Sequence, residues 1–287
     1  MIQQFAGLKV KNTKDVFNKD TKICMMLYEQ AKRGKTTLAA SLDALTKKHD
    51  GKPSLFIAIE PSDGGGTLSI QDYGVDYIQP TTIAELDRIV AALKTDKTYG
   101  GVILDNGSEY IKSFVQPLSL QQSFPGCNTY PTRLIGVPAR NDYQIMGEVA
   151  RIFFNKLVCL TSLPNMEFRK HLIVTALIKE RFDDEGTLIR IGPDLPGALA
   201  DSCTAMFQTV VRINLRKIAR PDPDNPSKSV SQFMRYLQTK PKGKEIVDDR
   251  TRVFPDAYPL TNSKGEPVGL DTIYEEFWLP RLKELDA

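Results

Sequence analysis

Short apolar runs alternate with amphipathic segments along the chain as far as residue 179. Four runs contain almost no polar residue, at 22–28 (KICMMLY), 54–60 (SLFIAIE), 100–106 (GGVILDN) and 171–178 (HLIVTALI). Continuous runs of this length are typical of strands that are covered on both faces. Large apolar residues recur at helical spacing between them, in 35–48, 82–95 and 141–163. Strands that alternate with helices predict crossover units and a mainly parallel sheet.

The pattern after residue 179 indicates shorter elements. Residues 179–192 (KERFDDEGTLIRIG) predict a hairpin that turns at Glu185 and Gly186, and strands are expected in 206–218 and 231–240. The segment 220–229 contains three prolines and predicts a loop, whereas 270–285 predicts a terminal helix interrupted at Pro280. We therefore expect an N-terminal segment (1–20), an α/β core (21–255) and a C-terminal tail with a helix (256–287).

Composition narrows the class of protein. An apolar fraction of 41% with 25% charged residues over 287 residues is ordinary for a globular protein and argues against global disorder. The longest apolar run, 172–178, is too short to cross a bilayer, and residues 1–15 lack the apolar core of a signal peptide. The expectation is a cytoplasmic protein with no membrane partner. The four scattered cysteines argue against a metal knuckle and are interpreted as reduced thiols, mostly in the core, and two histidines are too few for a histidine-rich metal site.

Positive charge is concentrated in one region although the net charge is only +3. The window 205–247 contains nine Lys or Arg residues and three acidic residues. Such a cluster fits either a surface that binds nucleic acid or a solvated basic face. The sequence leaves both interpretations open.

A phosphate-binding loop is indicated by residues 24–42, CMMLYEQAKRGKTTLAASL. The pattern G-x-x-x-x-G-K-[ST] is met at its last three positions, Gly34, Lys35 and Thr36, but its first position is Glu29. The apolar strand before the loop and the amphipathic helix after it favour nucleotide binding through residues 31–37 (Ala31, Lys32, Arg33, Gly34, Lys35, Thr36 and Thr37). A degenerate loop with only a structural role is the alternative.

Glu29 is compatible with a bound phosphate only if its side chain points away. A carboxylate about 4 Å from a phosphate costs on the order of 4 kcal/mol at an effective dielectric constant of 20. Lys32 and Arg33 add two positive charges to the loop, and they could pair with Glu29 or with the nucleotide.

Acidic residues follow two of the predicted strands. Asp105 ends 101–105 (GVILD), where a carboxylate can hold Mg²⁺, and it is followed by Asn106 and not by a second acid. A catalytic base must then come from elsewhere, and Glu60 at the end of the neighbouring strand is the candidate. Asp63 competes with Glu60 for this role, and a strand-end cap is the structural alternative for Glu60.

The order of these parts resembles the RecA/Rad51-like ATPase core, and most of all the phage-encoded RecA-like proteins of the compact recombinase or single-strand-annealing type. The matching segments are GKTT (34–37), LFIAIE (55–60), VILDN (102–106), HLIVTAL (171–177) and GKEIVDDRTRVFP (243–255). The resemblance covers roughly residues 20–255 and implies a RecA-like P-loop core that binds ATP and Mg²⁺.

The resemblance also implies roles for individual residues. Lys35 and Thr36 would bind phosphate and Mg²⁺, Asp105 would orient the metal, and Glu60 would act as the base, with Lys35 assisting catalysis. The family usually has Gln or His where this chain has Leu177, so Thr175 or Lys179 would have to sense the γ-phosphate.

Single-stranded DNA and further copies of the chain are the partners that the resemblance implies. The long segment 115–141 offers Phe124, Tyr130, Arg133 and Arg140 for stacking and phosphate contacts, although the aromatic residues could equally pack against the body. Residues 179–197 offer Lys179, Arg181 and Arg190 among several acids. In a homo-oligomeric ring or filament, Lys244, Arg250 or Arg252 would reach the γ-phosphate of a neighbouring subunit.

Together these features predict an ATP-dependent protein that binds single-stranded DNA, hydrolyses ATP when DNA is bound, and promotes recombination, pairing or annealing in the cytoplasm of a phage host. The alternative is a nucleotide-binding interaction protein with little or no hydrolysis. A small-molecule P-loop kinase is disfavoured because no compact arginine-rich lid lies between the core strands.

Overall fold

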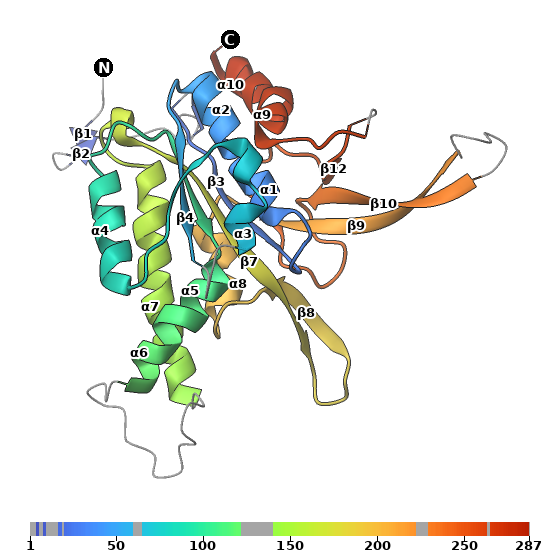
Figure 1. Ribbon diagram of the computed structural model, residues 1–287, viewed down its shortest axis with the longest axis horizontal. Coiled ribbons are helices and arrows are strands. Elements are labelled where there is room, and N and C mark those ends of the chain that lie inside the picture. The colour runs from blue at the N-terminus through green and yellow to red at the C-terminus, as the bar shows by residue number, and fades with distance from the viewer. Residues whose placement is uncertain are drawn as a thin grey trace.

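A mainly parallel sheet forms the centre of the protein (Figure 1). The computed structural model of the chain describes residues 4–5, 8–9, 17–18, 20–59, 65–121, 140–221, 229–262 and 265–286. The strand order is β12-β10-β9-β3-β7-β6-β4-β5, and neighbours run parallel from β9 to β5. The parallel strands are β3 (Cys24–Glu29), β4 (Ser54–Ala58), β5 (Asp76–Ile78), β6 (Gly101–Asp105), β7 (His171–Phe182) and β9 (Thr209–Pro221).

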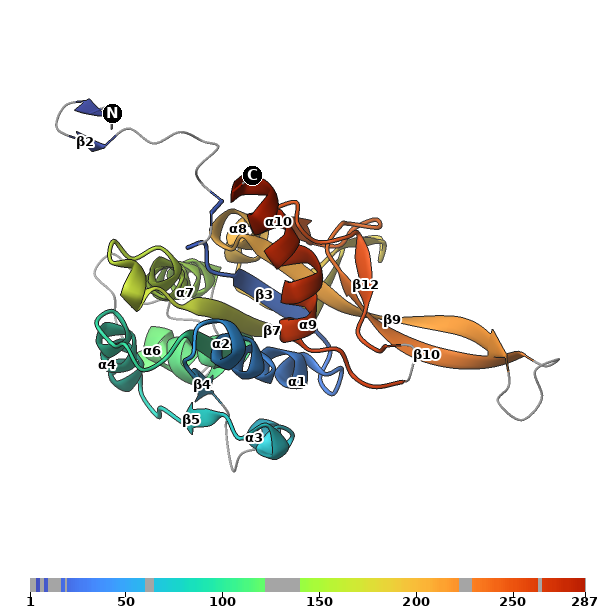
Figure 2. The ribbon, with the colours of Figure 1, turned by 90° about the horizontal axis from the view of Figure 1, so that it is seen from above.

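Antiparallel strands extend this sheet at one edge. β10 (Ser229–Gln238) pairs with β9 along ten residues of each strand to form a ribbon that projects from the body in Figures 1 and 2, and β12 (Ala257–Pro259) pairs with β10. β8 (Leu188–Pro193) folds back on β7, which confirms the predicted hairpin, and β11 (Asp248–Asp249) pairs with β9. A separate pair is formed by β1 (Gln4–Phe5) and β2 (Leu8–Lys9).

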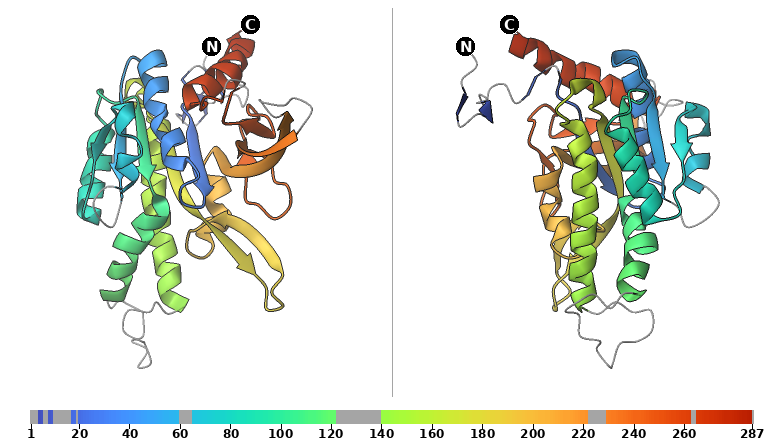
Figure 3. Two further views of the ribbon diagram at one scale, coloured as in Figure 1. Left: turned by 45° about the vertical axis from the view of Figure 1, so that its right-hand side comes forward. Right: turned by 90° about the vertical axis from the view of Figure 1, so that its left-hand side faces the viewer.

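Helices cover both faces of the sheet because side chains of each buried strand alternate between two cores. Met26 and Tyr28 of β3 pack with α4 (Ile83–Leu93), α7 (Arg140–Val158) and α8 (Leu199–Met206). Met25 and Leu27 pack with α1 (Lys35–Ala40), α2 (Leu42–His49) and the C-terminal helices α9 (Leu270–Ile273) and α10 (Leu279–Asp286). Figure 3 shows α4 and α7 side by side, where Lys156 bonds Asp87 at 2.7 Å.

The remaining helical pieces are short. They are α3 (Gly65–Leu68), α5 (Gly107–Tyr110), a π-helical turn (Ile111–Val115), α6 (Gln116–Gln121), a second π-helical turn (Tyr274–Trp278) and 3₁₀ turns at Gln71–Tyr73, Cys159–Thr161 and Met166–Phe168. No helix among the described residues has the length and apolar composition that crossing a membrane requires.

This architecture confirms the predicted fold class of a mainly parallel sheet flanked by helices, with antiparallel strands and a C-terminal helix. Three local predictions need correction. The predicted loop 115–141 begins as helix α6, and the predicted helix 141–163 ends at Val158 and continues as a 3₁₀ turn. The terminal helix is not interrupted at Pro280, because the π-helical turn Tyr274–Trp278 precedes the proline and the chain stays helical to Asp286.

Candidate functional site

The predicted phosphate loop lies where β3 ends and α1 begins, at the carboxyl end of the parallel strands. Its backbone is left-handed at Lys32 (φ 62°) and at Gly34 (φ 90°). Gly34 suits this conformation because it has no Cβ, whereas the same conformation is uncommon for a residue such as Lys32. Of the predicted residues, 31–34 therefore form a compact turn, and 35–37 begin α1.

Lys35 points back across this turn. Its Nζ donates to the carbonyl oxygens of Glu29 (2.9 Å) and Gln30 (2.8 Å), and the side chain is buried. Burial lowers the pKa of Lys35, and the charges of Asp105 and Glu29 offset part of that shift. The ammonium group is thus held inside the loop, at the position from which the P-loop lysine reaches a phosphate.

Asp105 meets the loop from the end of β6. Its Oδ2 accepts a hydrogen bond from Oγ1 of Thr36 at 2.8 Å, and its Oδ1 accepts one from the hydroxyl of Thr175 on β7. Burial raises the pKa of the carboxyl group, although both hydroxyls and the charge of Lys35 act in the opposite direction. The structure thus brings together the two predicted metal ligands, Thr36 and Asp105, and adds Thr175.

Glu29, at the start of the loop, has hydrogen-bond partners for both carboxylate oxygens. Its side chain is only 6% exposed, its Oε1 accepts the N–H of Gln30 at 3.1 Å, and its Oε2 accepts a hydrogen bond from Nε of Arg212 on β9 at 2.7 Å. Nη1 of Arg212 also lies 3.6 Å from Oε1 of Glu245. The carboxylate of Glu29 is thus paired with a cation of the same chain.

The partner of Glu29 differs from those that the sequence suggested. Arg33 donates to Oε1 of Gln30 at 3.3 Å instead. Arg212 follows Glu29 by 183 residues, and only the pairing of β9 with β3 brings the two together. Local charge spacing could not have indicated this pair.

The catalytic base is not assigned by the described residues. Glu60 and its competitor Asp63 lie outside them, although the backbone N–H of Ile59 donates to the carbonyl oxygen of Asp105 at 2.7 Å. Asn106 caps α5, since its Oδ1 accepts from the N–H of Glu109 at 2.7 Å. Asn106 thus has a structural role at the position that follows Asp105, the predicted metal ligand.

Thr175 and Lys179, the two candidates to sense the γ-phosphate in place of Leu177, lie in different environments. Thr175 contacts Asp105, whereas Nζ of Lys179 pairs with Asp194 at 3.2 Å. Leu177 itself donates its backbone N–H to Oγ of Ser108 at 2.9 Å. Of the two, only Thr175 touches the candidate metal site.

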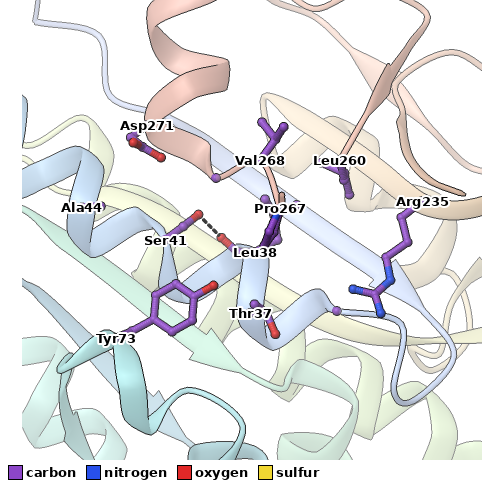
Figure 4. Close-up of a pocket in the computed structure, with 12 residues that line it drawn as sticks. Thr37, Leu38, Ser41, Ala44, Tyr73, Arg235, Leu260, Pro267, Val268 and Asp271 are labelled. Atoms are coloured by element: carbon purple, nitrogen blue, oxygen red, sulfur yellow. Dashed lines mark hydrogen bonds between the residues drawn. The ribbon is translucent and has the colours of Figure 1, made fainter. Parts of the chain in front are cut away.

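A pocket of about 220 Å³ adjoins the loop (Figure 4). One wall is the outer face of α1 and the start of α2, and the others come from the 3₁₀ turn that contains Tyr73, from β10, and from the chain that leads into α9. The lining residues are Gly34, Thr37, Leu38, Ser41, Ala44, Tyr73, Arg235, Leu260, Pro267, Val268, Gly269 and Asp271. Figure 4 shows Arg235 beside Thr37 and Asp271 at the opposite end. Of these residues, the sequence predicted Gly34 and Thr37, and most of the others belong to segments that are distant in the sequence.

A divalent metal would have few protein ligands here. No group of three or more His, Cys, Asp or Glu side chains that could bind a metal occurs in the described part of the chain. One hydroxyl and one carboxylate fit Mg²⁺, which takes one or two protein oxygen ligands and completes its shell with water and substrate phosphate. Thr36 and Asp105 would hold it, and the metal would neutralise phosphate charge.

The predicted DNA-binding residues are not brought together by the described structure. Phe124, Tyr130 and Arg133 lie outside the described residues, and Arg140 is the first residue of α7. On the β7–β8 hairpin, Arg190 pairs with Asp201, and Arg181 donates to the carbonyl oxygen of Gly197 at 3.3 Å. These two cations and Lys179 therefore already have partners within the chain.

The predicted trans-acting cations lie on the segment between β10 and β12. Lys244 donates to the carbonyl oxygen of Leu188, and Arg250 donates to that of Phe207 at 2.7 Å. Arg252 adopts a left-handed backbone with φ 55°. A role toward a neighbouring subunit stays a prediction for all three.

Comparison with known proteins gives limited similarity. The sequence matches no protein-family model and no curated protein. Among solved structures, the chain is similar to the crystal structure of a KaiC-like protein from the hyperthermophilic archaeon Pyrococcus horikoshii, with 14% sequence identity and a TM-score of 0.44 over 85% of this chain and 86% of that chain. The function is therefore inferred below from the residues of the chain itself.

Proposed function

We propose that the chain is a RecA-like P-loop ATPase that binds Mg²⁺-ATP. The observation that carries this proposal is the contact between Thr36 at the start of α1 and Asp105 at the tip of β6, beside the buried ammonium group of Lys35. A P-loop nucleotide site needs these three groups at one place: a cation for phosphate, and a hydroxyl and a carboxylate for the metal.

The pocket beside Thr37 accommodates the nucleoside. It starts at Gly34, runs along the outer face of α1, and ends at Asp271, so a nucleotide with its phosphates in the loop would extend into it. Tyr73 offers an aromatic face and Asp271 an acceptor for a sugar hydroxyl or an amino group. The ligand class is thus a nucleoside triphosphate, with ATP as the first choice.

Binding is tested by calorimetric titration with Mg²⁺-ATP. We expect saturable binding by the wild-type chain and at least about 10-fold weaker binding by Lys35→Ala, because hydrogen bonds to charged groups contribute about 1.5–3 kcal/mol. Lys283→Ala, an exposed change on α10, is the control. Equal affinity of Lys35→Ala and wild type would disprove the proposed site.

Single-stranded DNA and self-assembly complete the proposal. RecA-like ATPases of the kind that the sequence resembles act as oligomers on DNA, and we assign Lys179, Arg181, Arg190, Phe124, Tyr130, Arg133 and Arg140 to the DNA and Lys244, Arg250 and Arg252 to the neighbouring subunit. ADP release should rise when a single-stranded oligonucleotide is added, and DNA affinity should fall steeply with salt. Electron microscopy with ATP and the oligonucleotide distinguishes rings from filaments.

A nucleotide-binding protein with little hydrolysis is the second candidate. It is favoured by Asn106, which caps α5 where a second acid would activate water, and by the apolar Leu177. Tight ATP binding without ADP release, with and without DNA, would select this alternative and exclude the recombinase.

A further inference from the structure

Arg235 lies on β10, and its backbone is held by β9 on one side and by Leu260 on the other. It pairs with Leu215 of β9, and its carbonyl oxygen accepts the N–H of Leu260 at 2.9 Å. The next pair inward on the same face, Leu237 with Ile213, belongs to the core that contains α1. The side chain of Arg235 is thus the first one outside that core and faces the phosphate loop.

The guanidinium group lies against the last glycine of the loop. A Cβ added at Gly34 would be 3.0 Å from Nη1 of Arg235 and 3.5 Å from its Cζ. The absence of a side chain at Gly34 is what allows the arginine to come this close. Gly34 directly precedes Lys35, so Arg235 approaches the part of the loop that would surround phosphate (Figure 4).

Three cations near the site already have partners, whereas Arg235 and the loop residue Lys32 have none among the described residues. Arg212 pairs with Glu29, Arg216 stacks over the ring of Tyr236 at 4.8 Å, and Nζ of Lys35 bonds two backbone carbonyl oxygens. In the part of the chain that the structure describes, Arg235 makes no ion pair or side-chain hydrogen bond, and it is exposed at the mouth of the pocket. Its five N–H donors are free for a ligand.

We propose that Arg235 binds the phosphates of the nucleotide from within the same chain, as a second cation beside Lys35. The proposal rests on the proposed nucleotide site. A guanidinium group matches phosphate geometry with two parallel N–H donors, and here it is attached to the β9–β10 ribbon and not to the loop. Phosphate binding would therefore link the projecting ribbon to the loop.

The test compares Arg235→Ala with Lys217→Ala, using calorimetric titration of Mg²⁺-ATP in the absence of DNA. Lys217 is a matched control because it is exposed on the same face of the ribbon, one residue pair further out, opposite Phe233. We expect Arg235→Ala to weaken ATP binding about 10- to 100-fold and Lys217→Ala to leave it unchanged. Arg235→Lys should recover part of the affinity. Thermal unfolding should be the same for all three variants, since both positions are exposed.

Ligand series identify the group that Arg235 contacts. The loss of affinity in Arg235→Ala relative to wild type should be similar for ATP, GTP and CTP. It should decrease from ATP to ADP to AMP. An equal loss for AMP and ATP would place the contact on the nucleoside and overturn the assignment, as would wild-type affinity in Arg235→Ala. If Lys35→Ala loses binding while Arg235→Ala keeps it, only this inference fails. If the wild-type chain binds no nucleotide, the proposed function fails with it.

Discussion

At the scale of single residues, buried charge dominates the candidate site. Glu29, Lys35 and Asp105 are all buried within one loop and two strand tips, and each is compensated differently. Glu29 has an arginine, Lys35 has two carbonyl oxygens, and Asp105 has only two hydroxyl donors. Among the described residues, the burial of the Asp105 carboxylate is thus compensated by two hydroxyl donors and the nearby charge of Lys35.

Replacement of Asp105 by Asn should stabilise the metal-free protein at neutral pH. The folded pKa of Asp105 is raised above the unfolded value near 3.9, so its favourable contribution to stability is complete at low pH and is lost as pH rises through the folded pKa. The melting temperature of Asp105→Asn should exceed that of wild type at pH 7, and the difference should shrink toward pH 3. Mg²⁺-dependent ATP binding should weaken in the same variant. A lower melting temperature at pH 7 would contradict this account.

Removal of Arg212 should destabilise the fold because Glu29 would stay buried without its partner. Breaking a buried pair costs about 3–5 kcal/mol, so Arg212→Met should lower the free energy of unfolding by that order in urea titrations. The double variant Glu29→Gln with Arg212→Met should recover part of the loss, since the buried carboxylate of Glu29 is then absent. Additive losses in the double variant would show that the pair is not coupled.

At the scale of elements, a cluster of three polar side chains connects the end of α2 to the amino ends of two strands, away from the phosphate loop. Nζ of Lys22 lies 2.8 Å from both carboxylate oxygens of Asp50, and Nε2 of His171 lies 3.3 Å from Oδ2. Nδ1 of His171 accepts the N–H of Ile23 at 3.1 Å, which leaves the ring proton on Nε2 to face Asp50. This group fixes the end of α2 against β3 and β7, and so it supports the helix pair that follows the loop.

Replacement of Asp50 by Asn should lower stability at pH 7 more than at pH 3. Burial alone would raise the pKa of Asp50, but hydrogen bonds and charges from His171 and Lys22 outweigh it and hold the pKa below its usual value. The stabilising contribution of the Asp50 carboxylate to the free energy of unfolding is therefore present above the unfolded pKa near 3.9. It is lost as pH falls through the folded pKa. We expect a loss of about 2 kcal/mol at pH 7, measured by urea unfolding. A loss that is independent of pH would exclude this ion-pair explanation.

At the scale of the whole molecule, the C-terminal helices complete the core beneath the phosphate-loop helix. Trp278 is fully buried, its ring lies 6.2 Å from that of Tyr274 and 5.9 Å from that of Phe254, and the N–H of Leu270 bonds Oγ of Ser41 at the junction of α1 and α2. The same segment supplies the pocket residues Pro267 to Gly269 and Asp271. The C-terminal helices thus stabilise the fold, and the segment that leads into them shapes the proposed nucleotide site.

Truncation of Trp278 should reveal this double role. Loss of a large buried aromatic side chain costs about 3–5 kcal/mol, so Trp278→Ala should unfold at much lower urea concentration than wild type. ATP affinity should fall in the same variant at a temperature where it is still folded, because one wall of the pocket loses its support. Lys283→Ala, exposed on the same helix, should stay within about 0.5 kcal/mol of wild type. Unchanged ATP affinity in folded Trp278→Ala would show that the C-terminal helices do not support the pocket.

The sequence by itself determined the features that depend on local periodicity. The strand, loop and helix around Lys35 and the strand that ends in Asp105 follow from apolar runs and helical spacing, and parallel strands place such ends at one edge of a sheet. The hairpin that turns near Gly186 is also a local signal. These parts of the fold need only neighbours in the sequence to be recognised.

Only the tertiary structure decided which distant residues meet at that edge. Strand order sets β9 beside β3 and β7 beside β6, and this order joins Arg212 to Glu29, Thr175 to Asp105 and Arg235 to Gly34. The physical reason is that side-chain periodicity specifies which face of an element is buried, whereas the neighbour of a strand is chosen by packing of the whole sheet. The acid at the start of the predicted phosphate loop, Glu29, is therefore paired with Arg212, which follows it by 183 residues.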